Sequence, residues 1–201
     1  MVFADKDERS LPLDESGNLR HGTRPLTEVY AELEQVQKLG ISKSIGVSNF
    51  NSLQLKEVLN SCTIRPVMMQ LECHPCLAQK KLQKFCSDHG IALTAFAPIG
   101  RGNNTALAFN MLDDPVIKEV SAKYKKTPAQ ISLRYLLQRG ISAIPKTVSL
   151  TRLEENFDVF DFELESGDMD KLLNLDCNRR LVWWPDTKSS PYYPFKDGVE
   201  F

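Results

Sequence analysis

IALTAF, at residues 91–96, is the stretch that decides the fold, because it is short and almost wholly apolar. Such a run is typical of a parallel strand that helices cover on both faces. Gly90 separates it from residues 77–86, whose apolar side chains recur at helical spacing, and Pro98 ends it. The pattern predicts a helix that leads directly into a buried strand, followed by a loop at residues 100–106.

Three more short segments, rich in apolar and β-branched residues, predict strands at 44–48, 67–71 and 141–144. The predicted helices cover residues 26–36, 55–62, 77–86, 114–124, 127–139, 152–156 and 168–175. Four strand-helix units in succession predict parallel strands joined by crossover helices, hence an α/β fold. The pattern does not separate a doubly wound sheet from a barrel. A complete (β/α)8 barrel needs about 250 residues, so four units would form about half of one.

The helix that follows Thr127 has the clearest start signal in the chain. The Thr127 hydroxyl can cap the helix, Pro128 suits its first turn, and Gln130 completes a capping box three residues after the cap. We therefore expect a helix that begins at this point and ends before Gly140.

Composition limits the classes of function. The chain has 201 residues, of which 42% are hydrophobic and 25% charged, with a formal net charge of −1. A charge near zero argues against a nucleic-acid partner. No run approaches the roughly 18 apolar residues that span a membrane, and residues 1–20 are acidic where a secretory signal would be apolar. We expect a cytoplasmic protein with a small-molecule ligand.

Polar and aromatic side chains follow the predicted strands, where ligands bind in parallel α/β folds. Asn49 and Gln70 each offer a donor and an acceptor, which suits a carboxamide. Phe96 offers a face for a planar ring, and Lys146 a positive charge for a phosphate. Each also has an ordinary structural explanation: a cap, a surface amide, a core side chain and a solvated loop residue.

Three motifs occur together at these strand ends: GVSNF at 46–50, QLECHP at 70–75 and IPKT at 144–147, followed by Arg152, Glu155 and Asn156. In order and spacing they resemble the aldo-keto reductase family, over roughly residues 10–201. The resemblance implies a partial (β/α)8 TIM barrel, made of the last four strand-helix units and a C-terminal tail. It implies one incomplete domain over 1–201, with an N-terminal loop at 1–25 and a substrate-loop-like tail at 178–201.

The resemblance also implies NADP(H) as cofactor, bound without a Rossmann fingerprint. Ser48, Asn49 and Gln70 would hold the nicotinamide carboxamide. Phe96 would stack on the ring, at a position where the family usually has tyrosine.

Two further groups of cofactor contacts are implied. The segment after the third strand would approach the cofactor with Ala97, Pro98, Ile99 and Gly100, although Ala97 and the residues after Pro98 depart from the common family pattern. The 2′-phosphate and adenine would meet Lys146, Thr147, Val148, Arg152, Glu155 and Asn156. Two cations suit a phosphate monoester, which is nearly dianionic at neutral pH, and this favours NADP over NAD.

Catalysis in the family needs a tyrosine supported by lysine, aspartate and histidine, all in the first half of the barrel. None has a matching position here, so we expect no catalytic residue in this chain and negligible reduction of a carbonyl substrate. The alternative is an inactive, truncated product that acts as a nucleotide-binding or interaction module. A half barrel would expose two sheet edges, and we therefore expect self-association.

Trp183 and Trp184 suggest an apolar or aromatic wall for a small carbonyl substrate, and simple packing of the tail is the alternative.

Cys73 and Cys76 form a Cys-x-x-Cys motif between a predicted strand and helix, the setting of thiol redox motifs. The resemblance already accounts for Cys73. Adding Cys86 and His89 produces a spacing compatible with zinc, although Cys86 falls on the apolar face of its helix, which favours core packing.

Overall fold

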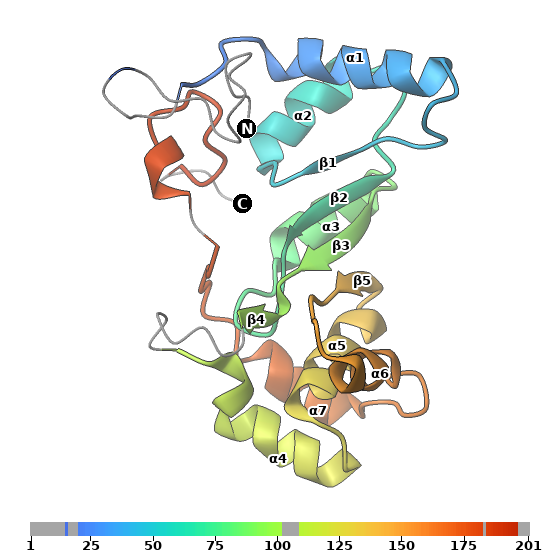
Figure 1. Ribbon diagram of the computed structural model, residues 1–201, viewed down its shortest axis with the longest axis vertical. Coiled ribbons are helices and arrows are strands. Elements are labelled where there is room, and N and C mark those ends of the chain that lie inside the picture. The colour runs from blue at the N-terminus through green and yellow to red at the C-terminus, as the bar shows by residue number, and fades with distance from the viewer. Residues whose placement is uncertain (1–14, 16–19, 102–108, 183, 197–201) are drawn as a thin grey trace.

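The computed structural model describes Glu15 and residues 20–101, 109–182 and 184–196. Its centre is a four-stranded parallel sheet in the order β1-β2-β3-β5 (Figure 1). The strands are β1 (Gly46–Ser48), β2 (Met68–Glu72), β3 (Ala92–Phe96) and β5 (Ile141–Ile144). Crossover helices join successive strands, which confirms the predicted parallel α/β fold and is consistent with part of a (β/α)8 barrel.

The helices occupy the predicted places with shifted ends. They are α1 (Leu26–Lys38), α2 (Ser52–Ser61), α3 (Lys80–Asp88), α4 (Pro115–Tyr124), α5 (Pro128–Gln138), α6 (Leu150–Phe157) and α7 (Ser166–Leu173). Two 3-10 turns are added, η1 (Met111–Asp113) and η2 (Pro185–Thr187). Within the described residues, no helix has the length and apolar character needed to cross a membrane.

Capping boxes start two of the helices. At α5 the Gln130 amide N–H donates to the Thr127 hydroxyl at 3.3 Å, and the Thr127 N–H donates to the Gln130 side chain at 2.9 Å, as predicted. Asn51 and Gln54 form the same arrangement at α2, with both bonds present. The sequence pattern contains this second box too, since Gln54 lies three residues after Asn51.

Two local expectations were wrong. The loop predicted at residues 100–106 was wrong at its start, because Gly100 and Arg101 belong to a further strand, β4 (Pro98–Arg101), outside the four-stranded sheet, while residues 102–106 lie outside the described residues. Leu77 does not lie in a helix, because it pairs with His74 across a tight turn, through bonds of 2.8 and 3.2 Å. Pro75 inside this turn supplies no N–H, and α3 starts only at Lys80.

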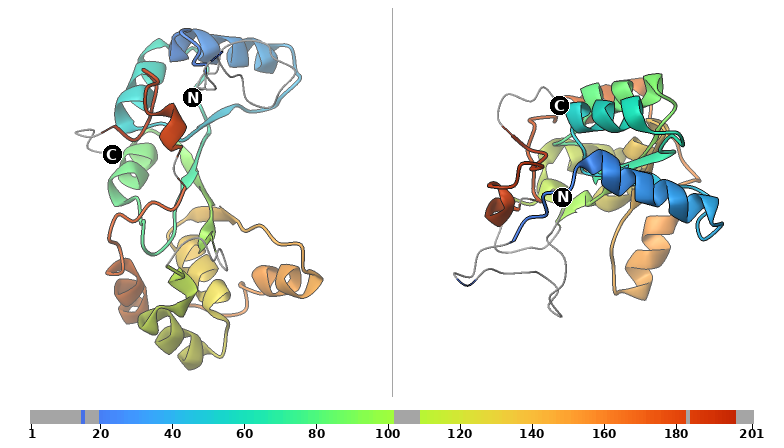
Figure 2. Two further views of the ribbon diagram at one scale, coloured as in Figure 1. Left: turned by 60° about the vertical axis from the view of Figure 1, so that its left-hand side comes forward. Right: turned by 90° about the horizontal axis from the view of Figure 1, so that it is seen from above.

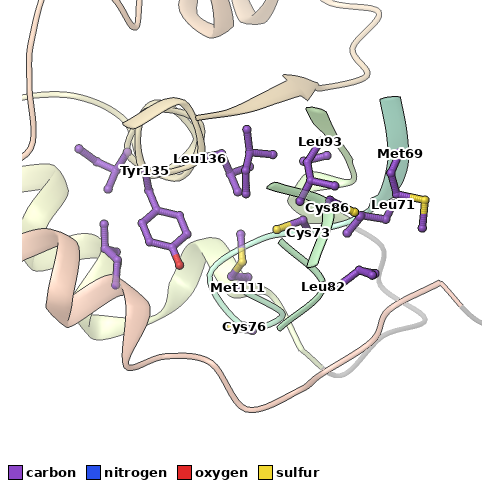
Figure 3. Close-up of a cluster of buried hydrophobic side chains, with 14 of the residues drawn as sticks. Met69, Leu71, Cys73, Cys76, Leu82, Cys86, Leu93, Met111, Tyr135 and Leu136 are labelled. Atoms are coloured by element: carbon purple, nitrogen blue, oxygen red, sulfur yellow. The ribbon is translucent and has the colours of Figure 1, made fainter. Parts of the chain in front are cut away.

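Alternation along the strands divides the sheet into two faces. On one face Met69, Leu71, Leu93, Ala95 and Ile141 pack against the helices in the main hydrophobic core (Figure 3). The opposite face carries more polar side chains, and most of its residues are exposed or half-buried. A second small cluster, made of Leu26, Tyr30, Ile45 and Val58, lies under α1 and α2. The main core therefore covers one face of the sheet. The other, more polar face is available for a ligand.

Helix α6 differs from the other helices because none of its residues is buried. Figure 2 shows it projecting from the rest of the fold. Three apolar side chains of the helix are exposed to solvent: Leu150, Leu153 and Phe157. Val148, which precedes the helix, is exposed as well.

Candidate cofactor site

A row of polar side chains crosses the open face of the sheet at a single level. The register places Ser48 beside Gln70, Gln70 beside Thr94, and Thr94 beside Ser142. The Thr94 and Ser142 hydroxyls lie 2.7 Å apart. Thr94 and Ser142 were not predicted as members of this row. Each is a polar residue in an otherwise apolar strand, and that pattern could have identified them.

Asn49 turns the chain directly after β1. Its φ is +57°, in the left-handed region that asparagine tolerates better than most residues. Its backbone N–H donates to the Gln70 carbonyl at 2.9 Å, and its Nδ2 donates to the Ser48 hydroxyl at 3.1 Å. The structure thus brings Ser48, Asn49 and Gln70 together, as the motif implied.

Two side-chain amides in this cluster have hydrogen-bonding atoms that no described residue satisfies. Asn49 Oδ1 is buried and accepts no hydrogen bond there. The side-chain amide of the half-buried Gln70 makes no hydrogen bond with any described residue either. Because buried polar groups are normally satisfied, the orphaned oxygen fits a ligand that supplies a donor, such as the N–H of a carboxamide.

Phe96 is half-buried at the end of β3, next to Ile144 in the sheet register. The chain then bends at Ala97, whose φ is +48°. Pro98, Ile99 and Gly100 follow in β4, where Gly100 has a φ of +70°. A Cβ atom on Gly100 would lie 3.5 Å from Leu181 and from Met111, so the chain passes close to the tail here.

Lys146 and Arg152 are two exposed cations after β5, and neither pairs with an acidic side chain in the described part of the chain. By contrast, Lys123, Lys126 and Lys171 all form ion pairs. Lys146 precedes α6, and Arg152 lies in its first turn, where Ser149 caps the helix.

The other predicted contacts on this side are dispersed over the segment before α6 and over the helix itself. The Thr147 hydroxyl accepts a hydrogen bond from the Ser149 N–H at 3.1 Å. Glu155 and Asn156 are half-buried on α6, and Val148 is 91% exposed. All of these residues follow the carboxyl end of β5, at the same edge of the sheet as Asn49 and Phe96.

Glu72 is a structural anchor that the sequence analysis included in a motif without giving it a role. It ends β2 and its side chain is fully buried. Its carboxyl oxygens accept the backbone N–H groups of Leu181 at 2.6 Å and Val182 at 3.1 Å. His74 Nε2 lies 3.1 Å away and the Arg180 guanidinium 3.6 Å away. Glu72 therefore holds the start of the C-terminal tail against the sheet.

The tail is also held at its far end. The Asn51 side chain donates to the Pro194 carbonyl, and Gln54 donates to the Tyr192 carbonyl, both at 2.9 Å. Trp184 stacks on Phe195 with ring centroids 5.7 Å apart. This contact is packing within the tail, the alternative considered for Trp184, while Trp183 lies outside the described residues.

No described tyrosine is available as a proton donor in this cluster. Tyr30, Tyr124 and Tyr135 lie on α1, α4 and α5, as predicted, and their hydroxyls bond to Ile64, Asp168 and Arg139. Burial raises the pKa of Tyr135 to about 12.

The other two tyrosines, Tyr192 and Tyr193, lie in the tail. The Tyr192 hydroxyl donates a hydrogen bond to the Thr23 carbonyl at 3.4 Å. Tyr193 is buried in the tail, where its ring packs edge-on against Phe195.

The Cys-x-x-Cys pair does not have the character of a reactive dithiol. Cys73 and Cys76 are both buried, and burial raises the pKa of each thiol to about 12. Reactive cysteines have lowered pKa values and some exposure. Cys86 lies in the core, His89 stacks on Phe85, and the described residues contain no cluster of three metal-ligating side chains.

Comparison with known proteins identifies the family. Residues 2–176 match the aldo/keto reductase family. The chain is 40% identical to prostaglandin F synthase 2 of Bos taurus over 197 residues, which cover 93% of this chain and 60% of that protein. It is 38% identical to aldose reductase C of Dictyostelium discoideum over 182 residues, or 90% of this chain and 55% of that protein.

A solved structure supports the same assignment. The aldose reductase of Schistosoma japonicum superposes with a TM-score of 0.86 at 37% identity, covering 94% of this chain and 60% of that one. The chain thus spans between 55% and 60% of the length of these relatives. With these matches, and with the family motifs at the ends of its parallel strands, the chain belongs to the aldo/keto reductase family.

Proposed function

We propose that this chain forms the cofactor-holding part of an NADP(H)-dependent oxidoreductase that reduces small aldehydes or ketones to alcohols. The observation that carries the proposal is Asn49 Oδ1, which is buried, accepts no hydrogen bond from the described residues and belongs to a residue hydrogen-bonded to the Gln70 backbone, within the motif that matches the family's nicotinamide site. When bound, the cofactor supplies the hydride. The amide groups of Asn49 and Gln70 hold the carboxamide, and so fix which face of the ring is presented.

The preference for NADP comes from Lys146 and Arg152. Both are exposed and neither is neutralised by an acidic side chain in the described region. A 2′-phosphate forms charge-assisted bonds with such groups, whereas an unmodified ribose hydroxyl would leave both without a counter-charge. The proposed adenosine contacts also include Thr147, Glu155 and Asn156, which lie close to these two cations in the sequence.

We also propose that the 201 residues by themselves do not reduce carbonyl compounds. No described tyrosine lies in the amide cluster with a hydroxyl that could donate a proton, and losing a positioned acid costs on the order of 10² to 10⁴ in rate. Purified chain should give no protein-dependent NADPH oxidation with an aromatic aldehyde. Robust turnover by this chain would contradict this part of the proposal while leaving cofactor binding intact.

A second candidate keeps the nucleotide site and replaces catalysis by interaction. It is favoured by the exposed apolar side chains before and on α6, such as Val148 and Phe157, which are 91% and 77% exposed. Exposed apolar surface of this kind is typical of interaction sites. We propose that copies of the chain associate through it.

Cofactor binding can be tested by titrating the full chain with NADPH and NADH while following tryptophan emission. NADPH should quench the emission, and Lys146→Met should weaken NADPH binding about tenfold or more, because one charge-assisted phosphate contact is lost. NADH binding should change little. Lys38→Met removes an exposed lysine at the end of α1 and serves as the matched control.

Equal affinity of the wild-type chain for the two nucleotides would contradict the 2′-phosphate site. Absence of any NADPH response, in emission or in melting temperature, would contradict cofactor binding altogether.

A further inference from the structure

The backbone carbonyl of Cys76 lies against Cys177, a residue 101 positions further along the chain. The Cys177 backbone N–H donates to the Cys76 carbonyl at 3.3 Å, and the Cys177 Sγ lies 3.7 Å from the same oxygen. Burial is the main cause of the raised pKa of the Cys76 thiol, and the nearby Cys177 adds to it. The two cysteine residues are thus neighbours in the folded chain, although the sequence motif paired Cys76 with Cys73.

Other contacts hold the two segments together. The Arg179 N–H also donates to the Cys76 carbonyl, at 2.9 Å. The Ala78 N–H donates to Asp176 Oδ1 at 3.1 Å, and the Lys80 ammonium lies 3.8 Å from the same carboxyl group. The residues that follow α7 are therefore fastened to the turn after β2. A disulfide requires two backbone segments held close together, and this arrangement provides them.

The two cysteines differ in their access to solvent. Cys177 is exposed, whereas only 4% of Cys76 is exposed. An oxidant can therefore reach the Cys177 thiol before it reaches the Cys76 thiol. We propose that Cys76 and Cys177 form a reversible disulfide when the chain meets a peroxide, which links the start of the C-terminal tail covalently to the turn after β2.

The reaction balances with one peroxide. The Cys177 sulfur attacks one oxygen of hydrogen peroxide, the O–O bond breaks, and the other oxygen leaves as water with the thiol proton, giving a sulfenic acid. The Cys76 sulfur then attacks the Cys177 sulfur. The S–S bond forms, the S–O bond breaks, and the oxygen leaves as a second water with the Cys76 proton. Two thiols are oxidised and one peroxide is reduced.

The second step is the slower one, because only a thiolate attacks well and burial raises the pKa of Cys76 to about 12. Cys73 takes no part in the reaction. Its Sγ points to the Ala78 carbonyl, 3.7 Å away, and it is fully buried.

The test is to treat the full chain with hydrogen peroxide, block the remaining thiols under denaturing conditions, and map the tryptic peptides without reduction. We expect a peptide pair joined through Cys76 and Cys177, and the loss of two of the five free thiols. Dithiothreitol should restore both thiols. The oxidised chain should migrate faster in a non-reducing gel, because the bond closes a long loop.

Cys177→Ser should abolish the linked peptide and the mobility shift, while Cys62→Ser, at a half-buried cysteine outside the pair, should leave both unchanged. Cys76→Ser should leave a sulfenic acid on Cys177 that dimedone traps. Oxidation of Cys177 in the wild-type chain to a sulfonic acid or an intermolecular dimer, with Cys76 still alkylated, would overturn the proposal. A Cys73–Cys76 link would overturn it as well.

Discussion

Glu72 shows, at the scale of a single residue, how a buried carboxyl group can organise a distant segment. Replacing it by Gln keeps the shape of the side chain and puts an NH2 group where an oxygen had accepted a backbone N–H. We expect Glu72→Gln to lower the free energy of unfolding by about 1–3 kcal/mol, because a buried donor loses its acceptor. Urea unfolding measures the loss. Glu154→Gln, at an exposed position on α6, should have little effect.

Gly46 makes a second prediction at this scale. A Cβ atom here would lie 2.6 Å from the Met68 carbonyl oxygen of the neighbouring strand, and a backbone atom cannot easily move aside. Gly46→Ala should therefore cost about 1–3 kcal/mol in thermal or urea unfolding. Gly167→Ala is the matched control, since nothing lies within 4 Å of its added carbon and alanine favours the helix. Equal stability of the two variants would contradict the close approach of β1 and β2.

Between elements, Asp168 links α7 to α4. Its carboxyl group accepts hydrogen bonds from the Lys123 ammonium at 2.7 Å and the Tyr124 hydroxyl at 2.8 Å. The bond from Lys123 is the main cause of the lowered pKa of Asp168, and the bond from Tyr124 adds to it. The group therefore binds its proton less readily in the folded chain than in the unfolded one.

This difference makes stability depend on pH. A carboxyl group with a lowered folded pKa contributes its stability above the unfolded pKa, near 3.9, and loses it as the pH falls through the folded value. Asp168→Asn should cost about 1 kcal/mol at pH 7, since the Lys123 partner is partly exposed and screened. The cost should shrink below about pH 4. Urea unfolding of wild type, Asp168→Asn and the exposed control Asp170→Asn at both pH values measures it, and a cost independent of pH would contradict the ionic contribution.

For the whole molecule, the open sheet face and the exposed apolar side chains of α6 predict association of the isolated chain. Light scattering should give a mass above that of one chain, increasing with concentration. Leu150→Gln with Phe157→Gln should shift the mass towards the monomer, because both side chains are more than two-thirds exposed and apolar. Leu53→Gln, on α2, is the control. A monomeric wild-type chain with a sharp, reversible melt would contradict the prediction.

The sequence by itself determined the order of strands and helices, the parallel fold and the family. Local signals made this possible: short apolar runs, capping residues such as Thr127 and motifs such as that around Asn49. They can be recognised in the sequence because each depends on residues that are neighbours in the chain. The start of α3 and the strand at residues 98–101 were not predicted, because a tight turn and a non-glycine residue with positive φ override the local pattern.

Only the tertiary structure decided which distant groups meet. It placed Glu72 against the backbone N–H of Leu181, left Asn49 Oδ1 without a hydrogen bond from any described residue, and brought Cys177 to the Cys76 carbonyl. These contacts join residues about a hundred positions apart or depend on burial. Hydrophobic periodicity carries no information about either, because it reports which face of an element is buried and not what lies opposite.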